Sequence, residues 1–241
     1  MTAQPDGYTL LVEGNAFWFK PLMQKSNYDV LRDFSPVTIN FNAPNIIAVH
    51  PSVPATSIRE LIALAKAKPG QLNYAAAVGS TPQIAMEMLK AMAGISIVHV
   101  PYKGSGLAVA GVAAGESQLL SASAAASASF IKSGKLRAIA VTSAQPSALL
   151  PGLPTVASSG LPGYDVSSLN GVLAVGKPPR AVINQLNRDI VRGLNSPEVK
   201  EKFLAVGVEP VGSTPEEFVA RIKSEVVRIG KVVKDAGIKI E

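Results

Sequence analysis

The chain has 241 residues, of which 47% are hydrophobic and none is cysteine, so it can bury a core in one large α/β domain or two lobes and has no disulfides or thiolate metal sites. Lysine and arginine number 23 against 17 aspartate and glutamate, a formal net charge of +6. Acidic and basic residues alternate in the C-terminal part and no basic run stands out, which argues against a nucleic-acid partner.

The N-terminal stretch MTAQPDGYTLLVEG lacks the basic region, apolar core and cleavage site of a secretion signal, so no signal peptide is expected in the sequence as written. Residues 9–12 form a short apolar run that predicts a buried strand, and a loop is expected after it. Residues 45–50 predict a second buried strand. Ser57 to Glu60 has the pattern of a capping box, so a helix is predicted up to Pro69.

Residues 70–104 predict a strand, a tight glycine turn, a capped helix, a second strand and a Pro-Tyr-Lys-Gly loop. Thr81 is the expected N-cap, with Pro82 at the first helical position, and Gly94 closes the helix. Further strands are predicted at 97–100, 136–142 and 172–175, and helices are predicted to start near Pro179 and at two capping sites, Ser196 and Thr214. This alternation of strand and helix favours parallel sheets covered on both faces.

The glycine turn at 78–81 has the features of an anion site. Backbone N–H groups at a helix start lack internal partners and lie at the positive end of the dipole, which favours a carboxylate by roughly 0.3–1 kcal/mol. The alternative is an ordinary capped helix. Lys103 either pairs with a ligand carboxylate or is an exposed lysine, and Tyr102 either lines a pocket or packs. The small-residue run at 121–129 either allows close backbone approach or forms a thin connection.

Catalytic chemistry is not evident in the sequence. The two histidines, His50 and His99, both lie in apolar strand-like runs without ligand spacing, so we interpret them as core or rim residues. No nucleophile elbow, paired carboxylates, zinc motif or phosphate loop occurs. Binding without turnover is therefore the preferred interpretation, with no enzyme activity, cofactor or metal expected. No apolar run reaches the ~18 residues of a membrane span, so direct membrane insertion is not expected either.

Several segments, in this order and spacing, resemble the periplasmic substrate-binding proteins of tripartite tricarboxylate transporters, the Bug family. The resemblance covers nearly the whole chain. The matching segments are PDGYTLL at 5–11, VHPSVPATSIRELIALAKAKPGQLNYA at 49–75, the Gly79-Ser80 turn, AGISIVHVPYKG at 93–104, IKSGKLRAIAVTS at 131–143, LPGLPTVASSGLPGYDVSSLNG at 150–171 and GVEPVGSTPEEFVARIKSE at 207–225.

The resemblance implies an α/β, two-lobed fold of the type II periplasmic-binding-protein kind, with residues 1–44 and 169–241 as one lobe and 45–168 as the other. It implies a periplasmic protein that captures a small organic carboxylate and delivers it to membrane transporter subunits. The residues expected to face the ligand come from both lobes: Gly14, Asn15, Ala16 and Phe17 from the first, and Val78, Gly79, Ser80, Thr81, Gln83, Tyr102 and Lys103 from the second.

The chain departs from the family pattern in three places. Family members usually carry a signal peptide, a first strand and a glycine-rich loop before the segment that opens this chain, so an N-terminally truncated lobe with unpaired strand edges is expected. Gln83 stands where the family commonly has histidine, and Leu169 where it commonly has tryptophan. Two alternatives therefore stay open: a partner that presents its ligand to a sensor, and a non-functional fragment.

Overall fold

The computed structural model describes residues 3–238, so Met1 and Thr2 of the expected leaderless N-terminus lie outside the described part. The chain divides into two compact units: unit 1 comprises Met1–Ala43 and Ser168–Glu241, and unit 2 comprises Pro44–Ser167. Each unit is an α/β body with its own sheet. The chain passes between the units twice, just after residue 43 and just before residue 168.

The sheet of unit 1 is antiparallel throughout and has the order β1-β8-β2-β9. Its strands are β1 (Leu10–Gly14), β2 (Phe34–Ala43), β8 (Ser168–Val175) and β9 (Glu209–Pro210). The prediction of a buried strand at 9–12 is wrong, because among residues 3–238 β1 pairs with β8 alone, at the edge of the sheet, and Val12 is 58% exposed. The prediction of parallel strands is also wrong for this unit.

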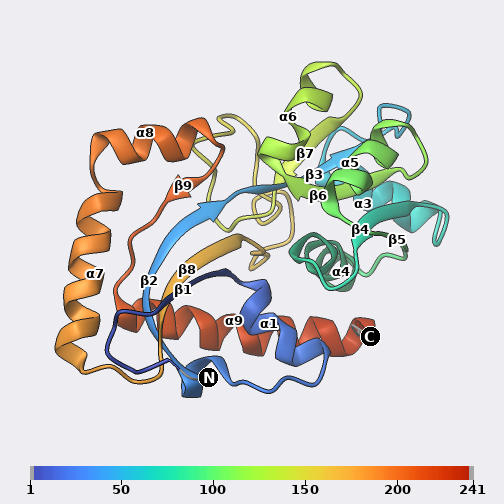
Figure 1. Ribbon diagram of the computed structural model, residues 1–241. Coiled ribbons are helices and arrows are strands. Elements are labelled where there is room, and N and C mark those ends of the chain that lie inside the picture. The colour runs from blue at the N-terminus through green and yellow to red at the C-terminus, as the bar shows by residue number, and fades with distance from the viewer. Residues whose placement is uncertain (1–2, 239–241) are drawn as a thin grey trace. The chain divides into compact units, whose positions relative to one another are not determined.

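The helices of unit 1 cover both faces of this sheet (Figure 1). They are α1 (Ala16–Met23), α2 (Val30–Asp33), α7 (Arg180–Leu194), α8 (Pro197–Ala205) and α9 (Pro215–Ala236). Ile183 of α7 packs on Val172 and Ala174, whereas Phe218 of α9 contacts the neighbouring Gly171, whose side of the strand is the opposite one. The caps predicted at Ser196 and Thr214 are confirmed, the second as a complete capping box.

The sheet of unit 2 is mixed and has the order β5-β4-β6-β3-β7. Its strands are β3 (Asn45–Val49), β4 (Asn73–Ala77), β5 (Val98–Tyr102), β6 (Leu119–Ser123) and β7 (Arg137–Val141), and its helices are α3 (Ile58–Ala67), α4 (Thr81–Ala93), α5 (Ser105–Ala113) and α6 (Ala124–Lys132). The predicted parallel arrangement holds only for β5, β4 and β6, because β3 pairs antiparallel with both of its neighbours.

Two local details of unit 2 differ from a simple pattern. Ser57 caps α3 as predicted, and the Glu60 carboxylate accepts its strongest hydrogen bonds from the N–H and the hydroxyl of Thr56. The small-residue run at 121–129 is the end of β6 followed by most of α6. Ser121 and Ser127 are buried there, whereas residues 125, 126, 128 and 129 are exposed, so only part of the run is closely packed.

Candidate functional site

Three helix starts lie at the same edge of the sheet in unit 2. β4 pairs in parallel with β5 and β6, so the carboxyl ends of these three strands meet at one edge. Each strand leads directly into a helix: β4 into α4, β5 into α5 and β6 into α6. Because each helix start carries partial positive charge from its unpaired N–H groups, this edge is a favourable position for an anion.

The turn between β4 and α4 is held by Gly79 and Ser80. Gly79 has φ +72°, a conformation that glycine adopts without strain. Ser80 is the N-cap: its Oγ accepts a hydrogen bond from the Gln83 N–H at 3.3 Å and donates one to the Ala77 carbonyl at 2.7 Å. The prediction of Thr81 as N-cap is wrong, because Ser80 has the extended backbone that a cap requires and Thr81 is already helical.

The amides of this turn are already engaged within unit 2. The Gly79 N–H donates to Gln83 Oε1 at 2.7 Å, and the Ser80 N–H donates to the Ala77 carbonyl at 3.3 Å. The other end of the Gln83 carboxamide lies 3.2 Å from His99 Nδ1. The expectation of unpartnered N–H groups at Gly79 and Ser80 is therefore corrected, whereas the assignment of this turn to a ligand site stays a prediction.

The start of α5 is open where that of α4 is closed. Its N-cap is Gly104, which has no side chain to cap the first turn, and the first intrahelical bond runs from the Ala108 N–H to the Gly104 carbonyl. The N–H groups of residues 105–107 therefore precede the first intrahelical donor, the Ala108 N–H, and all three residues are exposed. The sequence pattern predicts only the PYKG loop here. The signal that was missed is the small and apolar run that follows it.

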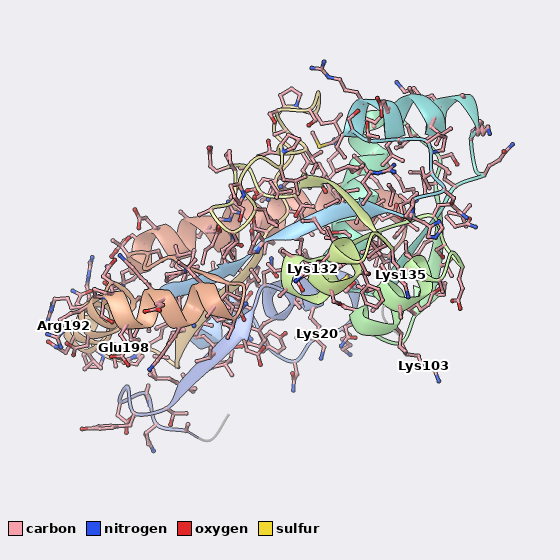
Figure 2. The ribbon with its side chains drawn as sticks, turned by 90° about the horizontal axis from the view of Figure 1, so that it is seen from above. Lys20, Lys103, Lys132, Lys135, Arg192 and Glu198 are labelled. Carbon is pink, nitrogen blue, oxygen red and sulfur yellow. The ribbon has the colours of Figure 1, made fainter. Side chains whose placement is uncertain are left out.

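Lys103 lies immediately before this open helix start. It is exposed and forms no ion pair within residues 3–238 (Figure 2). Tyr102, by contrast, packs inside its own unit: its ring lies against Gly111, where an added Cβ would fall 2.3 Å from the phenol oxygen. Its hydroxyl donates to Glu116 at 2.9 Å, and burial together with this carboxylate raises the pKa of Tyr102. This geometry favours packing over pocket lining for Tyr102.

The start of α6 completes the edge. Ser123 is its N-cap and accepts from the Ala126 N–H at 3.2 Å, and the Ala124 N–H donates to the Pro44 carbonyl. Within the described part of the chain, the hydroxyl oxygens of Ser121 and Ser127 are buried without a hydrogen-bond partner. These two hydroxyls flank the helix start in sequence, and the alanine-rich reading of this segment did not single them out.

The candidate residues of unit 1 lie at the junction of β1 and α1. The predicted loop at 14–17 is wrong: Gly14 ends β1, Asn15 is the N-cap of α1, and Ala16 already belongs to the helix. Asn15 is buried and its N–H donates to the Leu169 carbonyl at 2.9 Å. Phe17 stacks on Tyr28 with ring centroids 4.6 Å apart, so its ring serves the packing of unit 1.

Other chemistries find little support in the described residues. No group of three or more His, Asp or Glu side chains within 3–238 has the arrangement of a metal site. The two histidines are engaged locally, as expected: His50 with Ser52 and His99 with Gln83 and Ala76. Across the same residues, none of the helices combines the length and the apolar character that crossing a bilayer requires.

Two α/β units joined by two chain crossings, one of them with helix starts gathered at a sheet edge, define the class of two-lobed solute-binding proteins. Within this class, residues 1–238 match the family described as the tripartite tricarboxylate transporter family receptor, TctC. The chain belongs to this family, which includes the Bug proteins, as the resemblance predicted.

Relatives of known sequence extend along nearly the whole chain. BugT of Bordetella pertussis is 34% identical over 240 residues, which are 98% of this chain and 74% of BugT. A protein from the tcbD-tcbE intergenic region of Pseudomonas sp. strain P51 is 32% identical over 237 residues, 96% of this chain and 70% of that protein.

Solved structures show the same fold. Rpa4515 of R. palustris, determined with adipate, superposes with a TM-score of 0.83 at 33% identity and covers 99% of this chain and 81% of its own. The periplasmic binding protein BugD superposes with a TM-score of 0.77 at 28% identity and covers 100% and 82%. The α/β, two-lobed fold expected from the sequence is thereby confirmed.

Proposed function

We propose that this protein captures a small organic carboxylate and delivers it to the membrane subunits of a tripartite transporter in the periplasm. The observation that carries the proposal is the gathering of three helix starts at one sheet edge of unit 2, in a chain of the tripartite tricarboxylate receptor family. The adipate in the related R. palustris structure supports a dicarboxylate as the ligand class.

Charge in this unit favours an anion. Residues 45–168 hold eight lysines and arginines but only four acidic residues. All four acidic side chains are engaged: Glu60 with Thr56, Glu87 with Lys90, Glu116 with Tyr102, and Asp165 with Ala144 and Ser167. Lys103 adds a free positive charge beside the open start of α5, where a carboxylate would gain both a charge-assisted hydrogen bond and the helix dipole.

The proposed donors differ from those expected first. The N–H groups of Gly79 and Ser80 already donate to acceptors within unit 2. We therefore assign binding of the carboxylate to the N–H groups at the start of α5, together with Lys103. The 78–81 turn shapes the same edge. Gly14, Asn15, Ala16 and Phe17 of unit 1 are assigned to ligand binding by family resemblance.

The protein is proposed to bind without turnover. A receptor family supplies this expectation. Both nitrogens of the His99 ring already have partners, namely Gln83 and the Ala76 carbonyl. Product formation from any carboxylate in the panel below would contradict this part of the proposal.

Thermal unfolding with a panel of carboxylates tests the proposal. Adipate, glutarate, succinate and citrate are each added to the purified protein, with uncharged hexanediol as the control for chain length. A ligand at 100 times its Kd stabilises the protein by about 2.7 kcal/mol, a clear rise in Tm. No rise with any carboxylate would overturn the proposed function.

A pair of lysine variants locates the grip. Lys103→Ala is expected to weaken the binding of the best carboxylate about tenfold, because it removes the charge beside α5. Lys135→Ala removes an equally exposed lysine of unit 2 that lies after α6, and it serves as the matched control with affinity unchanged. Equal effects of the two variants would reduce the role of Lys103 to general electrostatic attraction.

A further inference from the structure

The Gln83 side chain lies between two groups that belong to different elements of unit 2. It is 6% exposed, its Oε1 accepts from the Gly79 N–H at 2.7 Å, and its Nε2 lies 3.2 Å from His99 Nδ1. His99 Nε2 in turn lies 3.0 Å from the Ala76 carbonyl oxygen. The chain of contacts therefore runs from Ala76 of β4 to the His99 ring of β5, then to the Gln83 side chain of α4, and ends at Gly79 in the turn before α4.

Donor and acceptor chemistry permits one assignment of this chain. The Ala76 carbonyl can only accept, so His99 Nε2 carries the proton. In the neutral ring Nδ1 is then an acceptor, and it receives a hydrogen bond from the Gln83 NH2 group. This leaves the carboxamide oxygen facing the Gly79 N–H, as the 2.7 Å contact requires. The opposite amide orientation would set donor against donor at Gly79.

The His99 ring is held by a stacking contact as well as by the hydrogen bonds of its nitrogens. Tyr74 of β4 stacks on it with centroids 4.8 Å apart and planes 21° from parallel. The Tyr74 hydroxyl donates to Glu87 of α4, and Glu87 also pairs with Lys90 at 2.8 Å. The charged groups next to the ring are thus already matched to each other, and the ring orientation is fixed by stacking and by Ala76.

We propose that Gln83 is a positioning residue, which holds the 78–80 turn in the geometry of the ligand site and takes its own orientation from the Nε2-protonated, neutral form of His99. The inference rests on the proposed function in one respect only, that the turn shapes the ligand site. A ring with N–H groups at both nitrogens would face the Gln83 NH2 group, and the turn would lose its acceptor for Gly79 N–H.

The tautomer is tested first, without any ligand. The chain has only two histidines, so long-range proton–nitrogen spectra of the labelled protein contain two ring systems. At neutral pH we expect His99 to carry a proton on Nε2 alone. A proton on Nδ1 of His99, alone or together with Nε2, would overturn the inference. His50, which contacts Ser52 outside this chain of contacts, serves as the internal reference.

Gln83→Glu supplies a readout that simple packing would not change. A carboxylate at this position still accepts from the Gly79 N–H, but it has no proton to donate to His99 Nδ1. His99 is therefore expected to gain a proton at Nδ1 at the same neutral pH, while the His50 signals stay in place. Unchanged His99 signals in a folded Gln83→Glu protein would contradict the proposed hydrogen bond from Gln83 to His99.

Gln83→Met tests the consequence for the turn and for the ligand. Methionine has a similar volume but leaves the Gly79 N–H without its acceptor, so we expect the Gly79 amide to exchange with solvent at least about tenfold faster. Affinity for adipate is expected to fall about tenfold. Unchanged Gly79 exchange would overturn the inference, as would unchanged adipate affinity.

Gln118→Met is the matched control. Gln118 is also a partly buried glutamine of unit 2 whose Oε1 accepts a backbone N–H, that of Asn73 at 2.8 Å, but at the opposite end of β4. Its loss is expected to leave Gly79 exchange and adipate affinity as in the wild type. If the wild type binds no carboxylate, the proposed function fails. The histidine spectra and the Gly79 exchange still test whether Gln83 and His99 hold the turn.

Discussion

Both units pack helices against a sheet, but the strands of the two sheets run in different relative directions. Unit 1 has an antiparallel sheet, so successive helices start at both ends of its strands, and its helices carry exposed ion pairs such as Lys202 with Glu198. Unit 2 has three parallel strands, which place the starts of α4, α5 and α6 at one edge. The comparison teaches that strand direction gathers the helix starts of unit 2 at the edge where we propose that an anion binds.

The units also treat buried charge differently. Unit 1 encloses Glu225, which is 2% exposed and bonded to Trp18 and Arg221. In unit 2 the buried Glu87 is shared by Tyr74 and Lys90, and its network continues to the His99 ring by stacking. Buried polar networks therefore stabilise the helix packing in unit 1, whereas in unit 2 the network lies beside the candidate site.

The largest expected effect is in unit 1. Trp18→Ala removes a ring that is 2% exposed and packs edge-on against Phe218, and it also removes the partner of Glu225. We expect the free energy of unfolding to fall by about 3–5 kcal/mol, measured by urea unfolding followed by far-ultraviolet circular dichroism. Trp18→Phe keeps much of the packing and should lose less. A loss below about 1 kcal/mol for the alanine variant would contradict the packing described.

A smaller effect is expected at the start of α4 in unit 2. Ser80→Ala removes the N-cap oxygen and should lower the free energy of unfolding by about 1 kcal/mol. Ser80→Asn keeps a capping oxygen and is the matched control, with a change of a few tenths of a kcal/mol. Equal losses in both variants would mean that capping at Ser80 does not stabilise this helix.

The pH dependence of unit 1 should carry the signature of Glu225. Burial raises the pKa of this carboxyl above its usual value of 4.5, and it outweighs the opposing effects of Arg221 and Trp18. In the window just above 4.5 the folded protein therefore holds a proton that the unfolded chain has lost, so stability falls as pH rises, by at most about 1.4 kcal/mol per pH unit.

Glu225→Gln isolates this contribution. The neutral amide still offers an oxygen to Trp18 but has no proton to lose. The free energy of unfolding of the wild type relative to the variant should therefore be constant below the window and fall as pH rises through it. Urea unfolding at a series of pH values measures the difference. A difference that does not change with pH would show that the carboxyl titrates normally.

The smallest effect is expected for a surface ion pair of unit 1. Lys202 and Glu198 lie 2.6 Å apart on α8, but their side chains are 72% and 76% exposed. Lys202→Ala should change the free energy of unfolding by less than about 0.5 kcal/mol, and the difference should shrink further in high salt. A loss above 1 kcal/mol would mean that the exposed ion pairs of unit 1 matter more than the comparison assigns to them.

Helix ends were the most predictable features of the chain. Ser57, Ser196 and Thr214 have cap patterns that act through hydrogen bonds between residues three apart, so the sequence alone locates them. Strand burial was less predictable. The apolar run at 9–12 has the composition of an interior strand, but its exposure depends on which strands flank it, and β1 has a neighbour on one side only among the described residues.

The local structure of the candidate residues was predictable only in part. The Gly79 turn and PYKG are recognisable from local residues. The acceptor of the Gly79 N–H, by contrast, is the Gln83 side chain, which is oriented by His99, sixteen residues after Gln83. Thr81 and Ser80 are both good caps by composition, and only the backbone conformation decides between them. The open start of α5 follows from a glycine N-cap, a feature easily read as the end of a loop.

The position of Trp18 gives the protein a built-in reporter. It is the only tryptophan of the chain, and it lies in α1 of unit 1. Indole emission therefore follows the melting of unit 1 alone, whereas circular dichroism follows both units together. If the two transitions coincide, the units unfold as one cooperative body; if emission changes at a different urea concentration, each unit has a stability of its own.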